Sequence, residues 1–249
     1  MPRGRCHFAM LHLLHERLRE ALPEMAELAD RFFPHFVAGS VAPDALRILG
    51  KMGKLPTHFY DEEDRDTWGK SVSGMFASHP DLADPGALEE VDQVLLMGYL
   101  SHLTVDEAFR DTITTQVHGI DIWRPIIQGL WSWMDEMPIG YTDLIPAMDG
   151  FVRQDHIGFI DCGVVKAFLD RTRPWAEQSD PWRVEKVFLG MIESDLSDEE
   201  AKREMEAHRA LAAPFLEQEQ EPRFVEEAMQ TGLKAIRGFF SGRYLRADP

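Results

Sequence analysis

The sequence predicts a globular all-α protein, and three observations support this prediction. Apolar residues recur at i, i+3 and i+4 spacing in several stretches, most clearly over residues 6–22 and 89–115. No stretch alternates apolar and polar residues as a half-buried strand would. Hydrophobic residues make up 44% and charged residues 28% of the 249, which is ordinary for a globular protein. We therefore expect a single multi-helix domain, with residues 1–175 as its core and residues 176–249 as C-terminal helices packed on that core.

The first helix is expected over residues 6–22, just ahead of a proline. Its apolar stripe begins at His7 and continues through three leucines: Leu11, Leu14 and Leu18. The same periodicity places His12 and His15 on a more polar face. We therefore expect His7 to point inward and the other two histidines to be solvated.

The next segments contain two further candidate site residues. A second helix is expected over residues 24–36, and the segment Gly-Ser-Val-Ala-Pro-Asp at 39–44 favours a turn. Asp44 ends this turn and is a natural N-cap for a helical run over residues 45–49. His58 follows a loop over residues 51–56 and precedes two aromatic residues. Taken alone, Asp44 fits a helix cap and His58 fits a packed structural histidine.

The central helix, expected over residues 89–115, carries the histidine–aspartate pair around which the chain is organised. Its apolar stripe is Val91, Leu95, Gly98, His102, Val105 and Phe109. Asp106 lies one turn after His102, so the two side chains are neighbours. Among apolar side chains such a pair must be hydrogen-bonded, ion-paired or metal-bound, because unpaired burial of a polar group costs about 2–7 kcal/mol. About one His-x-x-x-Asp pair is expected by chance in a chain with 10 histidines, so a structural hydrogen bond is the simpler alternative.

The remainder of the chain is also expected to be helical. The aromatic stretch 123–134 fits the protein core better than a cofactor-binding segment, and residues 143–170 are expected to form one further helix. A capping box at Ser197 should open a helix that ends before Pro214. Pro222 lies in the expected first turn of a last helix, which ends near Phe239.

The charge and the cysteine content exclude several classes of protein. The formal net charge of -17 argues against binding to nucleic acid or to an anionic membrane, since both attract basic proteins. Two cysteines give neither a disulfide framework nor a Cys-x-x-Cys motif. The first residues lack the apolar segment of a signal peptide, and no run of 18 apolar residues occurs. A cytoplasmic protein without stable membrane association is therefore expected.

Four features occur in a specific order along the first 110 residues. They are the inward His7, the turn 39–44 that ends in Pro-Asp, the His-Phe-Tyr-Asp segment from His58, and Gly-Tyr-x-Ser-His-x-x-x-Asp over residues 98–106. This ordered set resembles the zinc-dependent phospholipase C family, whose all-helical fold is shared with the S1/P1-type nucleases. The resemblance is more specific than any one of its four parts.

The resemblance implies a zinc cluster. The residues that match the four ligands of one zinc site are Asp44, His58, His102 and Asp106. His7 matches a histidine of a neighbouring site, which uses the aspartate matched by Asp106 as a bridge. Secreted relatives complete a third site with a histidine where this chain has Thr112, and with a later His-x-x-x-Glu pair that this chain lacks. The other candidates for completing a site are His118, His156 and Asp161. One zinc ion, or two at most, is therefore expected, although Mn²⁺ or Fe²⁺ also accepts such ligands.

The resemblance further implies hydrolysis of a phosphoric ester. In that chemistry Asp44 or Asp106 orients a water molecule, and Arg110 either clamps a phosphate oxygen or forms a surface ion pair with Asp111 or Glu107. Because the chain is acidic, a small soluble phosphodiester or phosphomonoester is the expected substrate, in preference to a phospholipid or a nucleic acid. The alternative class is a non-catalytic helical domain with a closed structural or binding metal site.

Overall fold

The computed structural model describes residues 3–61, 64–117, 119–177, 180–192, 196–216 and 220–246. The predicted all-α fold class is confirmed. The helices are α1 (Gly4–Ala21), α2 (Pro23–Arg31), α3 (Phe33–Gly39), α4 (Ala42–Ile48), α5 (Leu55–His58), α6 (Ser71–Ser78), α7 (Glu90–Thr112), α8 (Trp123–Met134), α9 (Leu144–Gly150), α10 (Cys162–Ala176), α11 (Pro181–Ile192), α12 (Asp198–Ala212) and α13 (Gln220–Phe240). Two short antiparallel strands, β1 (His156–Ile157) and β2 (Ile160–Asp161), form a hairpin.

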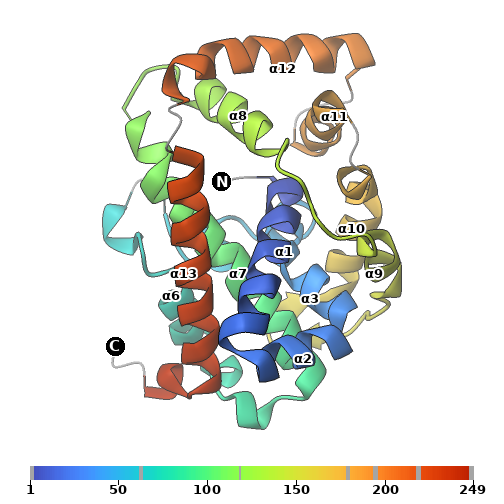
Figure 1. Ribbon diagram of the computed structural model, residues 1–249, viewed down its shortest axis with the longest axis vertical. Helices are drawn as coiled ribbons and strands as arrows, with labels where there is room; N and C mark the ends of the chain where they lie inside the picture. The colour runs from blue at the N-terminus through green and yellow to red at the C-terminus, as the bar shows by residue number, and fades with distance from the viewer. Residues whose placement is uncertain are drawn as a thin grey trace.

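The central helix α7 is enclosed by other helices. It packs against α3, α13, α1 and α6, and Figure 1 shows α1 and α13 running alongside it. Every residue from Val94 to Asp106 is buried, whichever face of the helix it occupies. A helix that is buried all round has no solvated face, so its polar side chains must find partners inside the protein. Both His102 and Asp106 belong to this buried stretch.

Two glycines allow α3 and α7 to cross at close range. A Cβ atom at Gly98 would lie 2.2 Å from the carbonyl oxygen of Phe36 and 2.9 Å from the Cα atom of Gly39. A Cβ atom at Gly39 would likewise lie 2.1 Å from the carbonyl oxygen of Leu95. Because backbone atoms cannot move aside as flexible side chains do, only glycine fits at either position.

The Gly98→Ala variant tests this close crossing. We expect it to lower the free energy of unfolding by about 3 kcal/mol, because the new methyl group forces the two helices apart. Urea unfolding of the two proteins measures the difference. Gly86→Ala is the control, since its Cβ would meet only a side-chain oxygen of Asp84, at 3.3 Å. Equal losses in both variants would contradict a tight crossing.

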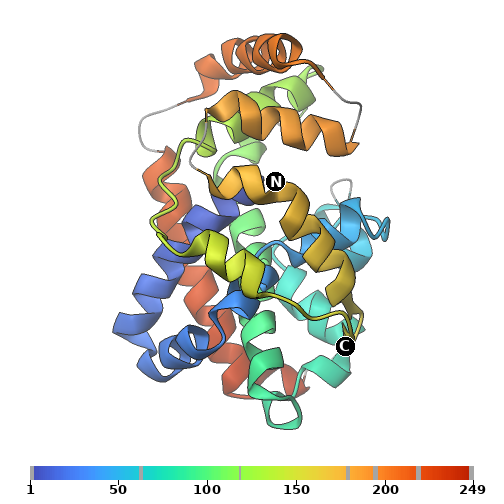
Figure 2. The ribbon, with the colours of Figure 1, turned by 90° about the vertical axis from the view of Figure 1, so that its right-hand side faces the viewer.

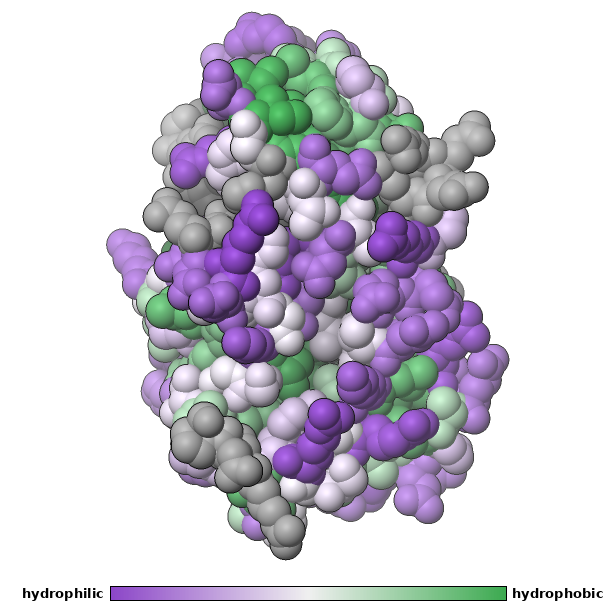
Figure 3. Space-filling model, turned by 90° about the vertical axis from the view of Figure 1, so that its left-hand side faces the viewer, coloured by the Kyte–Doolittle hydropathy of each residue, from purple (hydrophilic) through white to green (hydrophobic). Residues whose placement is uncertain are grey.

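The C-terminal helices occupy two places. Helices α11 and α12 pack on each other and on the earlier helix α8 at one end of the molecule, at the top of Figures 1 and 2. Helix α13 returns along α7 and α1. The predicted capping box is confirmed: Ser197 Oγ accepts from the Glu200 backbone N–H, and the Glu200 carboxylate accepts from the Ser197 backbone N–H. The face in Figure 3 is mainly hydrophilic, and its hydrophobic side chains gather mostly at the end where α8 and α12 lie.

Two of the expected helices are divided in the structure. The stretch expected as one helix over residues 24–36 forms α2 and α3, with a break at Phe32 (φ -121°, ψ 36°). Pro34 lies in the first turn of α3, where its missing N–H costs nothing. The stretch expected as one helix over residues 143–170 forms α9, the β1–β2 hairpin and α10. Gly158 turns the hairpin at φ +54°, a conformation that interrupts a helix.

No helix within the described ranges is both long enough and apolar enough to cross a membrane.

Candidate metal centre

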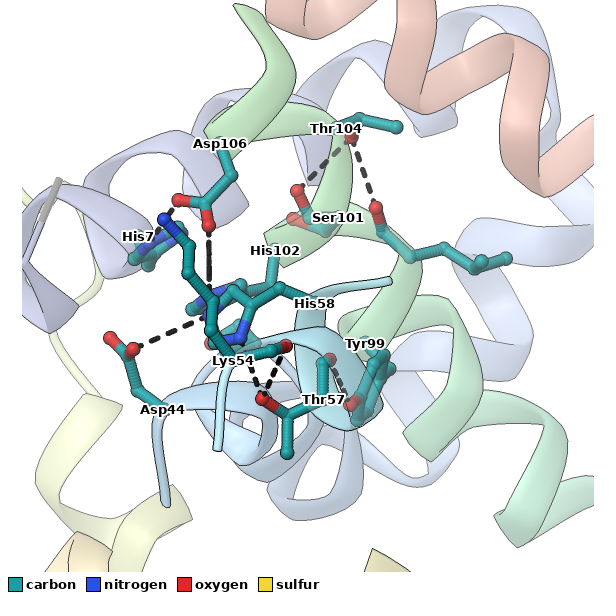
Figure 4. A network of polar contacts seen from close by, with 12 residues as sticks. His7, Asp44, Lys54, Thr57, His58, Tyr99, Ser101, His102, Thr104 and Asp106 are labelled. Atoms are coloured by element: carbon teal, nitrogen blue, oxygen red, sulfur yellow. Dashed lines mark hydrogen bonds and ion pairs between the residues drawn. The ribbon is translucent and has the colours of Figure 1, made fainter. Parts of the chain in front are cut away.

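Four helices bring five candidate ligands together. His7 comes from α1, Asp44 from α4, His58 from the end of α5, and His102 and Asp106 from α7. Figure 4 shows these side chains converging, with Asp106 facing His7 on one side and His58 on the other. Their donor atoms form two overlapping groups, His7–Asp44–His102 and His58–His102–Asp106, and within each group all the atoms lie within 4.8 Å of one another. The structure therefore brings together all five residues that the sequence selected as metal ligands.

A hydrogen bond determines which ring nitrogen of His102 carries the proton. Its Nδ1 atom lies 2.8 Å from the carbonyl oxygen of Ser40, and a carbonyl can only accept a hydrogen bond. Nδ1 therefore carries the proton, and Nε2 presents its lone pair to the centre. Burial lowers the pKa of His102 to about 3, and the neighbouring His7 adds to this lowering, so the ring is neutral at pH 7.

His58 is oriented in the same way by a different partner. The Thr57 hydroxyl lies 2.8 Å from the carbonyl oxygen of Gly53, to which it donates, and 2.8 Å from His58 Nδ1. It therefore accepts the Nδ1–H proton of His58, whose Nε2 atom keeps its lone pair. Tyr99 donates a 2.6 Å hydrogen bond to the carbonyl oxygen of Thr57 and fixes this turn to α7. Burial lowers the pKa of His58, which keeps its ring neutral as well.

The distances between the imidazole nitrogens and carboxylate oxygens of the centre fit a shared cation better than they fit direct hydrogen bonds. His58 Nε2 and His102 Nε2 lie 3.3 Å apart, and Asp106 Oδ2 lies 3.6 Å from the first and 3.7 Å from the second. Asp44 Oδ1 lies 3.5 Å from His58 Nε2. Nitrogen–oxygen hydrogen bonds are usually 2.7–3.2 Å, whereas ligands about 2.1 Å from a tetrahedral zinc ion lie roughly 3.4 Å from each other. Two lone pairs that face each other also repel unless a cation lies between them.

Asp106 is a carboxylate without a hydrogen-bond donor. Both of its oxygens are buried, and neither has a hydrogen-bond partner among the described residues. Burial by itself raises the pKa of this carboxyl, but the attraction of the neighbouring imidazoles, His102 first, outweighs it and holds the pKa below its usual range. An ionised carboxylate buried in this way requires a positive charge beside it.

His7 lies on the other side of Asp106. Its ring stacks on that of His102, with 3.7 Å between centroids and 9° between planes. Its Nε2 atom is 3.5 Å from Asp106 Oδ1, and neither ring nitrogen has a hydrogen-bond partner in the described part of the chain. Asp106 thus turns one oxygen to His7 and the other to His58 and His102, the arrangement that a carboxylate bridging two ions requires.

Asp44 does not cap a helix. It lies inside the first turn of α4, whose N-cap is Val41, so the cap interpretation is wrong. Pro43 and Asp44 both belong to this turn, which points the carboxylate at His58. Burial raises the pKa of Asp44, but the attraction of the neighbouring His58 and His102 outweighs it, and the pKa lies below its usual range. Its side chain is 7% exposed, which makes it the most accessible of the five ligands.

Arg110 lies one turn beyond Asp106 on α7. Its Nε atom is 3.2 Å from Asp111 Oδ1, so the expected ion pair forms. The arginine side chain is nevertheless only 4% exposed, and its guanidinium group lies over the rings of Tyr60 and Trp68. The ion-pair interpretation therefore accounts for only one of its nitrogens.

The remaining histidine candidates lie elsewhere. His156 and Asp161 are paired at 3.6 Å in the β-hairpin, where His156 is exposed and Asp161 half-buried, and neither belongs to either group of possible metal ligands among the described residues. His118 lies outside the described residues.

The expectation that His15 is solvated is wrong. The His15 side chain is buried because Tyr141 covers that face of α1. Its Nδ1 atom lies 3.2 Å from the Tyr141 hydroxyl, and its Nε2 atom lies 3.0 Å from a carboxylate oxygen of Asp30.

Sequence reasoning missed the residues that orient the ligands. These are Ser40, Thr57 and Tyr99. Ser40 acts through its backbone carbonyl, which any residue type supplies, so no pattern could have identified it. Thr57 directly precedes His58, and this position was its only signal, whereas Tyr99 belongs to the Gly-Tyr-x-Ser-His motif over residues 98–102, which gave it no separate role.

Comparisons with protein-family models, with curated proteins and with solved structures found no match to this chain.

Proposed function

We propose that this protein is a metal-dependent phosphoric-ester hydrolase of the phospholipase C-like type, with zinc as its ion. One observation carries the proposal: two neutral imidazoles direct lone pairs at each other across 3.3 Å, beside a buried carboxylate that has no hydrogen-bond donor. Histidine nitrogen and carboxylate oxygen are ligands that zinc prefers, although Mn²⁺ or Fe²⁺ also accepts them. The order of the five ligands along the chain supports the same family of hydrolases.

The five ligands suit one or two ions. A first ion would be held by Asp44, His58, His102 and Asp106, and a second by His7 together with the other oxygen of Asp106. Bound zinc supplies a Lewis acid that polarises a phosphoryl oxygen and lowers the pKa of a water molecule to about 7. Asp44 is the ligand at the solvent edge of the centre, so its carboxylate is the group placed to orient an incoming water.

The proposed substrate is a small soluble phosphate ester. A net charge of -17 repels a polyanion, so nucleic acid is disfavoured despite the family's kinship with nucleases. The same charge opposes stable binding to an anionic membrane surface. A small ester avoids both penalties because it carries few charges and enters the centre alone.

Metal content and turnover test this proposal together. Elemental analysis of protein purified without added metal or chelator is expected to find one or two zinc ions per chain. An aryl phosphodiester and an aryl phosphomonoester then serve as generic substrates, and we expect the protein to hydrolyse at least one of them. In His102→Gln turnover should fall roughly a hundredfold or more, because a ligand is lost. His12→Gln, on the edge of α1 that faces Tyr141, should keep full activity. The absence of metal would contradict the proposal.

The burial of the centre favours a second candidate function. The side chains of His7, His58, His102 and Asp106 are each at most 1% exposed. Structural zinc sites are closed by four protein ligands, whereas catalytic sites keep one position open. A closed site predicts bound zinc, no turnover of either aryl phosphate, and a lower melting temperature in His102→Gln. Turnover by the zinc-loaded protein would exclude this second function.

A further inference from the structure

Arg110 continues the line of ligands along α7. His102, Asp106 and Arg110 follow one another at intervals of four residues, so their side chains lie on the same face of the helix. All three are buried: His102 is 0%, Asp106 1% and Arg110 3% exposed. The guanidinium group is therefore the next functional group after the Asp106 carboxylate on the face of α7 that carries the metal centre.

Two aromatic rings hold this guanidinium group in place. Its Cζ atom lies 4.6 Å from the centroid of the Tyr60 ring and 4.9 Å from that of Trp68. Tyr60 is two residues after His58, and the rings of His58 and Tyr60 meet edge to face with 6.4 Å between centroids. The Lys54 ammonium lies 4.3 Å from the centroid of the same Tyr60 ring. One aromatic ring thus links the metal centre to the guanidinium group.

The terminal nitrogens of Arg110 are not used by the described residues. Nη1 and Nη2 are both buried and lack a hydrogen-bond partner there, while Nε faces Asp111. A buried guanidinium with unused N–H groups is costly, because these donors were hydrogen-bonded to water in the unfolded chain. The two nitrogens form a planar fork whose geometry matches two oxygens of a phosphate or a carboxylate.

The number of oxygens that this arrangement requires distinguishes two classes of phosphate ester. The guanidinium fork takes two oxygens, and the metal centre takes at least one more. A phosphomonoester has three terminal oxygens and satisfies both partners without sharing, whereas a phosphodiester has only two and must share one of them between the metal centre and the fork. We propose that the substrate is a phosphomonoester dianion, whose phosphate is held between the metal centre and the fork of Arg110. This inference rests on the proposed function. Trp68 is more exposed than Tyr60, so we expect the phosphate to approach from the side of Trp68.

Binding of two small phosphates to the zinc-loaded protein tests this inference without any need for turnover. The probes are methyl phosphate, a dianion with three terminal oxygens, and dimethyl phosphate, a monoanion with two. By calorimetry at pH 8 we expect methyl phosphate to bind roughly tenfold or more tightly than dimethyl phosphate. In Arg110→Met this preference should fall to roughly twofold or less, and Arg110→Lys should be intermediate because lysine keeps the charge but lacks the fork.

A matched control separates the role of the fork from a general effect of losing an arginine. Arg124 also lies over a tryptophan ring, at 5.5 Å from Trp123, but on the exposed part of α8. Arg124→Met should bind both probes as the unmodified protein does. The zinc content and the melting temperature of each variant are measured first, so that weaker binding is not confused with a loss of metal or of fold.

The possible outcomes distinguish this inference from the proposed function. Equal binding of the two probes, or a preference that persists in Arg110→Met, would overturn the inference. Hydrolysis of an aryl phosphodiester without hydrolysis of the monoester would also overturn it, while supporting the hydrolase. A preference that depends on Arg110 without any turnover would support the phosphate site and contradict the hydrolase. A protein that binds no metal would overturn both.

Discussion

Replacing Asp106 with asparagine is expected to abolish the effect of zinc on the stability of this protein. The carboxylate faces three histidines, at 3.5 Å from His7, 3.6 Å from His58 and 3.7 Å from His102. Asparagine has nearly the same shape but no charge, so the centre loses the group that both proposed ions share. At a zinc concentration one thousand times the dissociation constant, binding stabilises the native state by about 4 kcal/mol. For a chain of this size that corresponds to roughly 8–16 °C in melting temperature.

Thermal unfolding with zinc and with a chelator measures this effect. The unmodified protein should melt at a higher temperature with zinc than with chelator, and Asp106→Asn should melt at the same temperature in both. Asp170→Asn provides the control, because that carboxylate is exposed and pairs with Lys166 on α10. It should respond to zinc as the unmodified protein does. A full zinc response in Asp106→Asn would show that the metal binds elsewhere.

The second large effect concerns a buried group of charges that is separate from the candidate metal centre. Arg3 contacts Asp135 at 3.1 Å and Glu185 at 2.7 Å, and all three side chains are fully buried. Glu185 also lies 3.7 Å from His208, so this group joins the start of α1 to α8, α11 and α12. Burial, together with the repulsion of Glu185, raises the pKa of Asp135 to about 7 despite the opposing attraction of Arg3 and Arg5.

The raised pKa of Asp135 makes the folded state less stable as the pH increases. In the unfolded chain this carboxyl ionises near pH 4, whereas in the folded protein it keeps its proton until about pH 7. Between these values unfolding releases a proton, so a rise in pH favours the unfolded state. The contribution of Asp135 to the free energy of unfolding should fall by about 2–3 kcal/mol between pH 5 and pH 8.

The Asp135→Asn variant isolates this contribution, because the amide keeps an oxygen for Arg3 but does not titrate. Urea unfolding at pH 5 and at pH 8 gives the free energy of unfolding of each protein. The difference between the unmodified protein and the variant should shift by about 2–3 kcal/mol in favour of the variant as the pH rises. The exposed Asp121→Asn is the control and should show no such shift. A difference that is constant with pH would contradict the raised pKa.

The sequence predicted the helices wherever apolar periodicity and a clear terminal signal occurred together. The capping box at Ser197 and the last helix α13, with Pro222 in its first turn, illustrate this. The expected helix over residues 143–170 was wrong because the apolar residues around Phe159 also suit the β-hairpin, whose turn depends on the backbone of Gly158. Periodicity reports which side chains are apolar, and it does not report whether the backbone between them is helical.

For the candidate site, the sequence identified the side chains but not what orients them. His102 and Asp106 could be paired from helical spacing alone, because residues four apart on a helix are neighbours. His7, Asp44 and His58 required the resemblance, since nothing local shows that three other helices place these side chains beside α7. The carbonyl of Ser40, which fixes the proton on His102, reaches it only because Gly39 and Gly98 let α3 approach α7. Contacts of this kind arise from packing and leave no pattern in the sequence.

The long separation of His7 and Asp106 along the chain has a consequence for how the proposed centre would take up an ion. During synthesis His7 emerges before Asp106, which becomes available only after about one hundred further residues have been made. The first helix cannot complete the centre by local folding, since the loop between the two ligands must close before they meet. Loading with zinc would therefore mark the moment at which α1 docks, and a nascent chain stalled before Asp106 would not retain the ion.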